Sequence, residues 1–197
     1  EVGVDGKIRF LKNICGLWLI QESRRYWKAE GEDVPYAKMA SLAADAEPFR
    51  SLINPDSTLF AAAGRMPEKI QQYCRDTEQP LPETKGQIIR CVYESLALRY
   101  AQVWELLMKY TQTPPTTLHI VGGGCQDKLL NQFAANAIGT RVAACPVEAT
   151  GLGNILVQML SDGAIKDFAE GREVVLNSSV VESYEPADKE IWNEAKE

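Results

Sequence analysis

Long hydrophobic runs, paired cysteines and histidines are all scarce in this sequence. No stretch approaches the roughly 18 consecutive apolar residues of a membrane-spanning helix, and the N-terminus has neither an initiator methionine nor the basic-then-apolar order of a signal peptide. The five cysteines are widely spaced, no C-x-x-C pair occurs, and the chain has one histidine, so we expect no structural zinc site. These absences predict a cytoplasmic protein without a membrane span.

A concentrated basic surface is missing as well. The formal net charge is −6, and the 21 lysines and arginines are scattered rather than gathered in a stripe that could neutralise a phosphate backbone. We therefore expect no nucleic-acid or membrane partner and favour a small-molecule or protein ligand. With 197 residues, 45% of them hydrophobic, the chain can bury a core as one domain or two small ones.

Cys74 and Cys91 are the two cysteines that the sequence could bring together. They flank a proline-containing loop between two helical stretches, and they approach each other if those helices are antiparallel. In a cytosolic protein we expect two reduced thiols, with a disulfide as the alternative.

The first half of the chain has the apolar spacing of amphipathic helices. Apolar residues recur three and four positions apart over residues 8–28, which predicts a long first helix. Further helices are expected over residues 35–44, where a proline suits the first turn, and from Met66 to about Arg75, with a loop over most of residues 47–67. The strongest helical pattern covers residues 84–110 and predicts a buried scaffold helix.

The second half changes to an α/β pattern. Strands are predicted over residues 117–121 and 141–145, with helices over 127–137 and 149–161. Residues 174–197 are charged, and we expect one short helix there, carrying Trp192. The predicted fold class is α/β, a mostly helical chain with a small, incomplete sheet. Because two strands alone would leave an exposed edge, we expect more strands upstream and interpret the chain as a piece of a longer protein.

The sharpest local feature is the glycine turn after the first strand, formed by Gly122, Gly123 and Gly124. Three glycines let the backbone approach a ligand closely, and their amides, with the N-terminus of the next helix, suit a nucleotide's phosphates or the polar edge of its base. No Lys-Ser/Thr pair follows, as in a Walker A loop, and the G-x-G-x-x-G spacing of a dinucleotide turn is absent. A tight turn that binds nothing is the alternative.

Two blocks of sequence carry a family resemblance. One holds I-V-G-G-G at residues 120–124, L-L-N-Q at 129–132 and P-V-E-A-T-G-L-G-N at 146–154, and the other is L-K-N-I-C-G-L-W-L-I-Q-E at 11–22. The first block resembles the final adenosine-binding segment of the FGGY carbohydrate kinases. That family belongs to the actin-like (ribonuclease H-like) ATPase superfamily, and both blocks together are most similar to its members that act on L-rhamnulose.

The resemblance implies that residues 1–197 are a partial C-terminal nucleotide-binding domain, and that the N-terminal sugar-binding domain is absent. By the same resemblance Gly123 contacts ATP, Gly122 and Gly124 shape the turn, and Asn13 and Gln21 make further nucleotide contacts. On the predicted first helix the two amides lie eight residues apart, near one face, where both can donate and accept hydrogen bonds.

The activity implied for the complete protein is transfer of the γ-phosphoryl group of ATP to L-rhamnulose, giving L-rhamnulose 1-phosphate. The resemblance also implies Mg²⁺, with its ligands, the catalytic aspartate and the phosphate-binding turns upstream of this chain. We therefore assign no catalytic residue and no metal ligand, and we expect the chain to be inactive alone. The alternatives are an FGGY kinase for fuculose, xylulose or a related polyol, a non-catalytic actin-like nucleotide-binding domain, and a helical interaction module.

Overall fold

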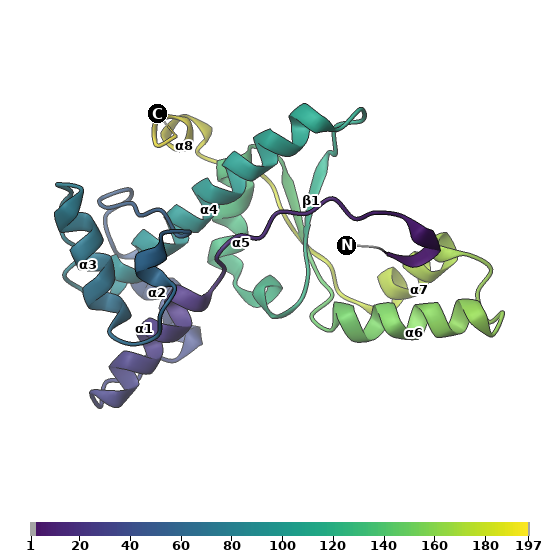
Figure 1. Cartoon of the computed structure of the whole chain (residues 1–197), viewed down its shortest axis with the longest axis horizontal. Helices are drawn as coiled ribbons and strands as arrows, with labels where there is room; N and C mark the ends of the chain where they lie inside the picture. Colours follow the sequence, from purple (N-terminus) through teal and green to yellow (C-terminus); the bar gives the residue numbers. More distant parts are fainter. Residues whose placement is uncertain (1–2, 197) are drawn as a thin grey trace. The chain divides into compact units, whose positions relative to one another are not determined.

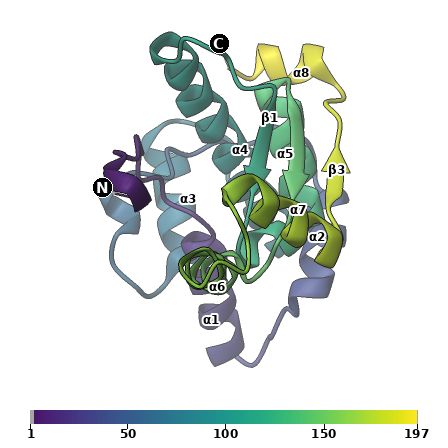
Figure 2. The same ribbon diagram turned by 90° about the vertical axis from the view of Figure 1, so that its right-hand side faces the viewer.

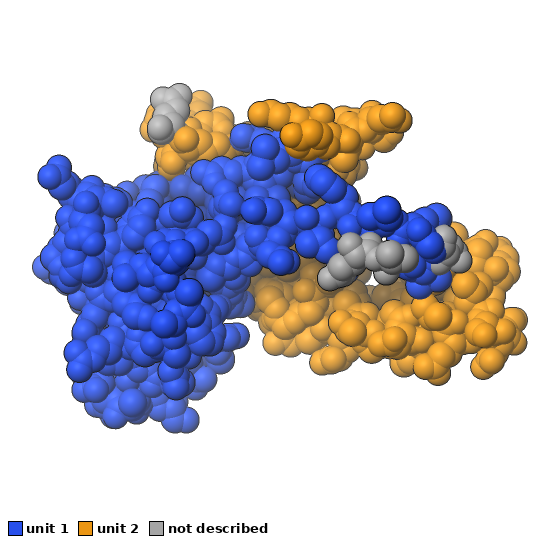
Figure 3. All heavy atoms as spheres, in the orientation of Figure 1, with its two compact units in different colours: residues 1–107 blue, residues 108–197 orange. Residues whose placement is uncertain are grey.

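The computed structural model describes residues 3–196 and follows the chain through eight α-helices and three strands in that range (Figure 1). The chain forms two compact units, residues 1–107 and 108–197 (Figure 3). The first unit is helical, and the second combines a small sheet with helices. This arrangement confirms the predicted α/β class with a mostly helical chain.

The helical unit is built from α1 (Trp18–Ala29), α2 (Tyr36–Ala44), α3 (Met66–Asp76) and most of α4 (Lys85–Tyr110), with short 3-10 turns η1 (Val4–Gly6) and η2 (Thr58–Phe60). Helix α1 packs on α3, and α3 also contacts η2. Helix α4 supplies much of the core, since its central residues are buried on several faces. The largest fully buried side chains here include Leu19, Met39, Phe60, Ile70, Tyr93 and Leu96. The predicted helices over 35–44, from Met66 and over 84–110 are thereby confirmed.

The first helix starts ten residues later than the sequence predicts. Residues 9–16 are irregular, Leu17 is the N-cap, and helix α1 begins at Trp18. The apolar residues that suggested an earlier start do not form a buried face, because Ile8 and Phe10 are 81% and 70% exposed. The prediction that Asn13 and Gln21 share a helix face is therefore wrong, since Asn13 lies before the helix.

The second unit contains a three-stranded mixed sheet in the order β1 (Thr117–Ile120), β2 (Arg141–Ala144) and β3 (Glu182–Tyr184). Strands β1 and β2 are parallel, and Leu118 is paired with Val142; β2 and β3 are antiparallel. Helix α5 (Lys128–Ile138) connects the parallel pair and packs against β2 and β3 (Figure 2). Helix α8 (Lys189–Glu194) also packs on α5, where the rings of Phe133 and Trp192 lie 5.3 Å apart between centroids.

Helices α6 (Ala149–Ser161) and α7 (Phe168–Ser178) lie against each other in the same unit. The sequence predicts α6 with its observed bounds but misses both α7 and β3. A capping pattern could have located α7, because Asp167 accepts from the Glu170 amide and Glu170 accepts from the Lys166 amide. Strand β3 has only three residues and no apolar alternation, so its pairing with β2 is what defines it. The expected sheet of two strands is thus corrected to three.

None of the helices within residues 3–196 combines the length and the apolar character needed to cross a bilayer.

Candidate functional site

The glycine turn lies at the carboxyl ends of the two parallel strands. The Gly122 amide donates to the Pro146 carbonyl at 2.9 Å, and the Cys145 amide donates to the Ile120 carbonyl at 3.0 Å. These two bonds join the segment that leaves β1 to the segment that leaves β2. In open α/β sheets this edge is where ligands bind, because loops from neighbouring parallel strands meet there.

The three glycines of the turn differ in why the fold needs them. Gly122 has φ of +80°, a left-handed conformation that favours glycine. Gly123 and Gly124 have no such conformation, and a Cβ built on either would meet no atom within 4 Å. Neither backbone strain nor packing explains why these two positions are glycine. Without side chains, the main chain at the exposed Gly123 and the half-buried Gly124 is open to a ligand.

The chain leaves the turn through η3 (Gly123–Gln126), a 3-10 turn, before α5 begins. The Asp127 carboxylate caps α5 by accepting from the Leu130 amide at 3.1 Å. The sequence-based interpretation counted this helix N-terminus as part of a positive site for phosphates, but a carboxylate of the chain occupies it. Because the Gly122 amide already donates to Pro146, the amides of Gly123 and Gly124 are the groups of the turn that we expect to bind an anion or a base edge.

Asn131 supports the turn from α5. Its side-chain amide donates to the Cys125 carbonyl at 2.8 Å, and the residue is almost fully buried. Cys125 is buried as well, and this burial raises the pKa of its thiol, as expected for a packed cysteine rather than a nucleophile. The sequence analysis gave Asn131 no role, although an asparagine between apolar residues of a helix is a signal for a buried hydrogen bond.

Asn13 and Gln21 lie in the helical unit on either side of the start of α1. Both residues are exposed, Asn13 in the irregular segment and Gln21 in the first turn of the helix. Two residues after Asn13, the Cys15 amide donates to Asp56 Oδ1 at 2.8 Å. Asp56 also accepts from Arg99 Nε at 2.8 Å, which connects this segment to α4. These contacts were not predicted from the sequence.

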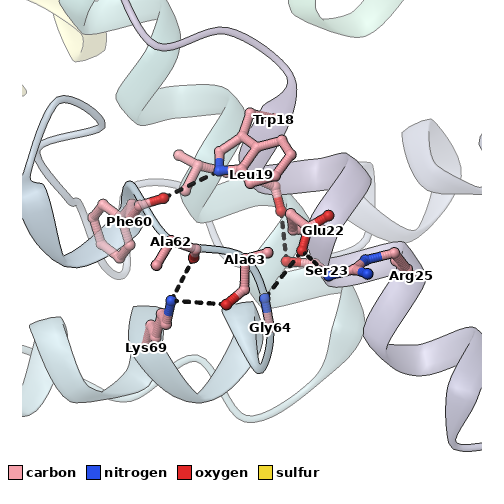
Figure 4. A network of polar contacts seen from close by, with 10 residues as sticks. All are labelled: Trp18, Leu19, Glu22, Ser23, Arg25, Phe60, Ala62, Ala63, Gly64 and Lys69. Atoms are coloured by element: carbon pink, nitrogen blue, oxygen red, sulfur yellow. Dashed lines mark hydrogen bonds and ion pairs between the residues drawn. The ribbon is translucent and has the colours of Figure 1, made fainter.

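A partly buried network of polar contacts joins α1 to residues 60–64 (Figure 4). Glu22 accepts from Arg25 at 2.6 Å and from the Gly64 amide at 3.1 Å, and the hydrogen bond from Arg25 lowers the pKa of Glu22. Trp18 Nε1 donates to the Phe60 carbonyl at 3.1 Å. Residues 60–64 are thus tied to the helix that carries Gln21. The sequence holds a signal for the burial of Glu22. It follows the buried Leu19 by three residues, which places its charge on the apolar face of the helix.

The same loop is tied to α3 from its other side. The Lys69 ammonium donates to the carbonyls of Ala62 and Ala63 at 2.5 and 3.4 Å (Figure 4). Residues 62–64 therefore lie between α1 and α3, with a hydrogen bond to each.

The residues expected to bind nucleotide belong to different units: Asn13 and Gln21 to the helical one, and Gly122, Gly123 and Gly124 to the one with the sheet. Their contacts with a nucleotide remain predictions. Among residues 3–196, no three His, Cys, Asp or Glu side chains gather into a group that could hold a metal ion.

Cys74 and Cys91, which the sequence could bring together, are buried free thiols. The interaction with Cys74 and burial raise the pKa of Cys91 well above the ordinary thiol value.

Comparison with known proteins gives consistent results. The sequence model of the FGGY family of carbohydrate kinases, C-terminal domain, matches residues 1–161. A rhamnulokinase of Bacteroides thetaiotaomicron is 48% identical over 99% of the chain, and one of Bacillus subtilis is 40% identical over 95% of it. The chain spans only 39% and 38% of these two relatives. The crystal structure of a gluconate kinase from Lactobacillus acidophilus superposes with a TM-score of 0.64 at 15% identity, covering 92% of this chain and 36% of that one.

Proposed function

Because the chain belongs to the FGGY family of carbohydrate kinases, matching its C-terminal domain, we propose that it supplies part of the ATP site of a kinase that phosphorylates L-rhamnulose. The sugar is proposed from the relatives of Bacteroides thetaiotaomicron and Bacillus subtilis, which are rhamnulokinases. The reaction is transfer of the γ-phosphoryl group of ATP to the primary hydroxyl of the ketose, giving L-rhamnulose 1-phosphate. The chain spans about two fifths of these relatives, and we propose that the sugar site and the catalytic base lie outside it.

The observation that carries the nucleotide role is the open main chain at Gly123 and Gly124. These glycines lie at the carboxyl ends of parallel strands, and no atom lies within 4 Å of a Cβ built on either. A nucleotide can approach such a turn to hydrogen-bond distance of the backbone, which a side chain would prevent. In this proposal Gly123 contacts ATP, Gly122 and Gly124 shape the turn, and Asn13 and Gln21 provide amides that donate and accept.

The proposal assigns this chain to binding and not to chemistry. Phosphoryl transfer requires an oriented sugar hydroxyl, a carboxylate base and charge compensation at the transferring group. Mg²⁺ supplies that compensation when it is bound with ATP. The residues described here contribute by fixing the position of the nucleotide.

A substitution at Gly123 tests the nucleotide role in the complete protein. Gly123→Val places an isopropyl group where the fold has room but where the proposed nucleotide lies. We expect KM for ATP to rise at least about tenfold, the effect of losing about 1.4 kcal/mol of binding, while KM for the ketose stays unchanged. Ala169→Val is the control, because it enlarges an exposed side chain on α7, outside the sequence blocks that resemble the adenosine-binding segment.

The outcome separates the candidate roles of the turn. If a folded Gly123→Val protein keeps the parent's KM for ATP, the turn does not bind nucleotide and the proposal fails. If both valine variants raise KM for ATP equally, the effect does not come from the turn.

A further inference from the structure

We propose that Asp56 is a positioning residue for the irregular segment, residues 9–16, and acts through the proposed nucleotide contact of Asn13. The inference rests on the proposed nucleotide contact of Asn13. It adds a residue to which neither the sequence pattern nor the family comparison gives a role.

The central observation is a hydrogen bond between a loop and the irregular segment. The Cys15 amide donates to Asp56 Oδ1 at 2.8 Å across 41 positions of sequence. Residues 9–16 belong to no helix or strand ladder, so a bond at Cys15 restrains the main chain two residues from Asn13. Without such a restraint, the residues around Asn13 would lose backbone freedom when the nucleotide binds, and that loss opposes binding.

Two hydrogen bonds attach the loop that carries Asp56 to one face of helix α4. Arg99 Nε donates to Asp56 Oδ2 at 2.8 Å, and Ser95, one turn earlier, accepts from the Ile53 amide at 2.9 Å. Ser95 in turn donates to the Cys91 carbonyl at 2.6 Å. The loop that carries Asp56 is thus attached to the most buried helix of the unit, and that attachment extends through Asp56 to Cys15.

The charge of Asp56 matters for this contact. Asp56 and Arg99 are partly shielded, with side chains 27% and 22% exposed. The Cys15 amide, followed by Arg99, lowers the pKa of Asp56, so the carboxylate is ionised at neutral pH. An ionised carboxylate accepts from an amide roughly twice as strongly as a neutral group does.

Steady-state kinetics of the complete protein tests the proposal. We expect Asp56→Ala to raise KM for ATP about tenfold, the size of one charge-assisted hydrogen bond, with kcat and KM for the ketose within about twofold of the parent. Asp56→Asn keeps an oxygen for the Cys15 amide and should lie between the two. Asp33→Asn is the matched control, since it removes a carboxylate that is likewise paired with an arginine, Arg24, at 3.1 Å.

A double-substitution cycle with Asn13→Ala distinguishes positioning from general loss of structure. If Asp56 acts through Asn13, adding Asp56→Ala to Asn13→Ala raises KM for ATP little further, whereas independent effects would multiply. If Asn13→Ala raises KM for ATP but Asp56→Ala does not, the inference fails and the proposed function stands. If Asn13→Ala itself has no effect, the proposed contact of Asn13 fails, and the positioning role fails with it.

Stability measurements keep the test decisive. If Asp56→Ala lowers the midpoint of thermal unfolding below the assay temperature, Asp56→Asn carries the test. A folded Asp56→Asn protein with the parent's KM for ATP, alongside an equally unaffected Asp33→Asn protein, would overturn the role of the charge.

Discussion

Glu22 is a carboxylate that folding places on the buried side of α1. Its side chain is 7% exposed, and it is kept ionised by Arg25 and by the Gly64 amide. The lowered pKa means that the folded state holds the proton less tightly than the unfolded chain. The ion pair therefore contributes stability that is fully present above the ordinary glutamate pKa and is lost as the pH falls through the lowered folded value.

Comparing the parent with Glu22→Gln measures this contribution. Glutamine keeps an acceptor for the Gly64 amide but loses the charge, so we expect the free energy of unfolding at neutral pH to fall by about 1 kcal/mol, a modest value because Arg25 is largely exposed. The difference should shrink as the pH falls below the ordinary glutamate pKa and through the lowered folded value, where the parent's Glu22 becomes protonated.

Denaturant titrations at several pH values provide the measurement. Glu47→Gln is the control, because its pair with Arg50 lies in solvent and should contribute less than about 0.5 kcal/mol. A difference between parent and Glu22→Gln that stays constant over this pH range would contradict the role given to the charge.

At the residue scale, the sequence predicted the glycine turn from its own pattern but not the side chains that support it. Three glycines after an apolar strand are a local signal. Asn131 binds a buried carbonyl, and its one signal in the sequence is an asparagine among the apolar residues of a helix. Asp56 binds a distant amide, and its type does not distinguish it from ordinary surface residues. Asn13 and Gln21 are proposed from the family resemblance, because an exposed amide has no physical signature of its own.

The helices α2 and α4 approach each other closely at Gly86. A Cβ built there would lie 2.3 Å from the Leu42 carbonyl oxygen, well inside van der Waals contact. The position of this Cβ is fixed by the α4 backbone, and the oxygen belongs to the α2 backbone, so no side-chain rotation can relieve the clash.

Gly86→Ala should therefore destabilise the protein, although alanine is the better helix former. We expect a loss of about 1–3 kcal/mol in the free energy of unfolding from overpacking. Gly153→Ala on α6 is the counterpart, because no atom lies within 4 Å of its Cβ and helix propensity alone predicts a gain of up to about 1 kcal/mol. Denaturant titration checks both, and a Gly86→Ala protein as stable as the parent would refute the close approach.

At the element scale, a helix is predicted correctly from the sequence when the residues that form its apolar pattern are also the ones that are buried. Helix α4 was predicted well because its apolar periodicity reflects a buried helix. The start of α1 was not, because apolar residues at positions 8 and 10 mimic a helical face while lying exposed in an irregular segment. Strand β3 is defined by its partner β2 rather than by its own residues, so a local pattern could not reveal it.

At the scale of the whole molecule, the residues proposed to contact ATP come from two separate stretches of the sequence. Asn13 and Gln21 belong to the helical unit and the glycine turn to the one with the sheet. The chain spans about two fifths of its rhamnulokinase relatives, so the proposed reaction is a property of the longer protein. In that protein, loss of either group of residues should weaken ATP binding without changing the choice of sugar.

Turnover of a panel of ketoses by the complete protein, with ATP consumption followed in a coupled assay, tests the proposed function most directly. L-rhamnulose, L-fuculose and D-xylulose belong in the panel, and the isolated chain of 197 residues serves as the comparison. We predict preferred turnover of L-rhamnulose by the complete protein and none by the isolated chain. Preference for another ketose would keep the kinase and replace the sugar, and absence of turnover on every sugar would contradict the proposed kinase activity.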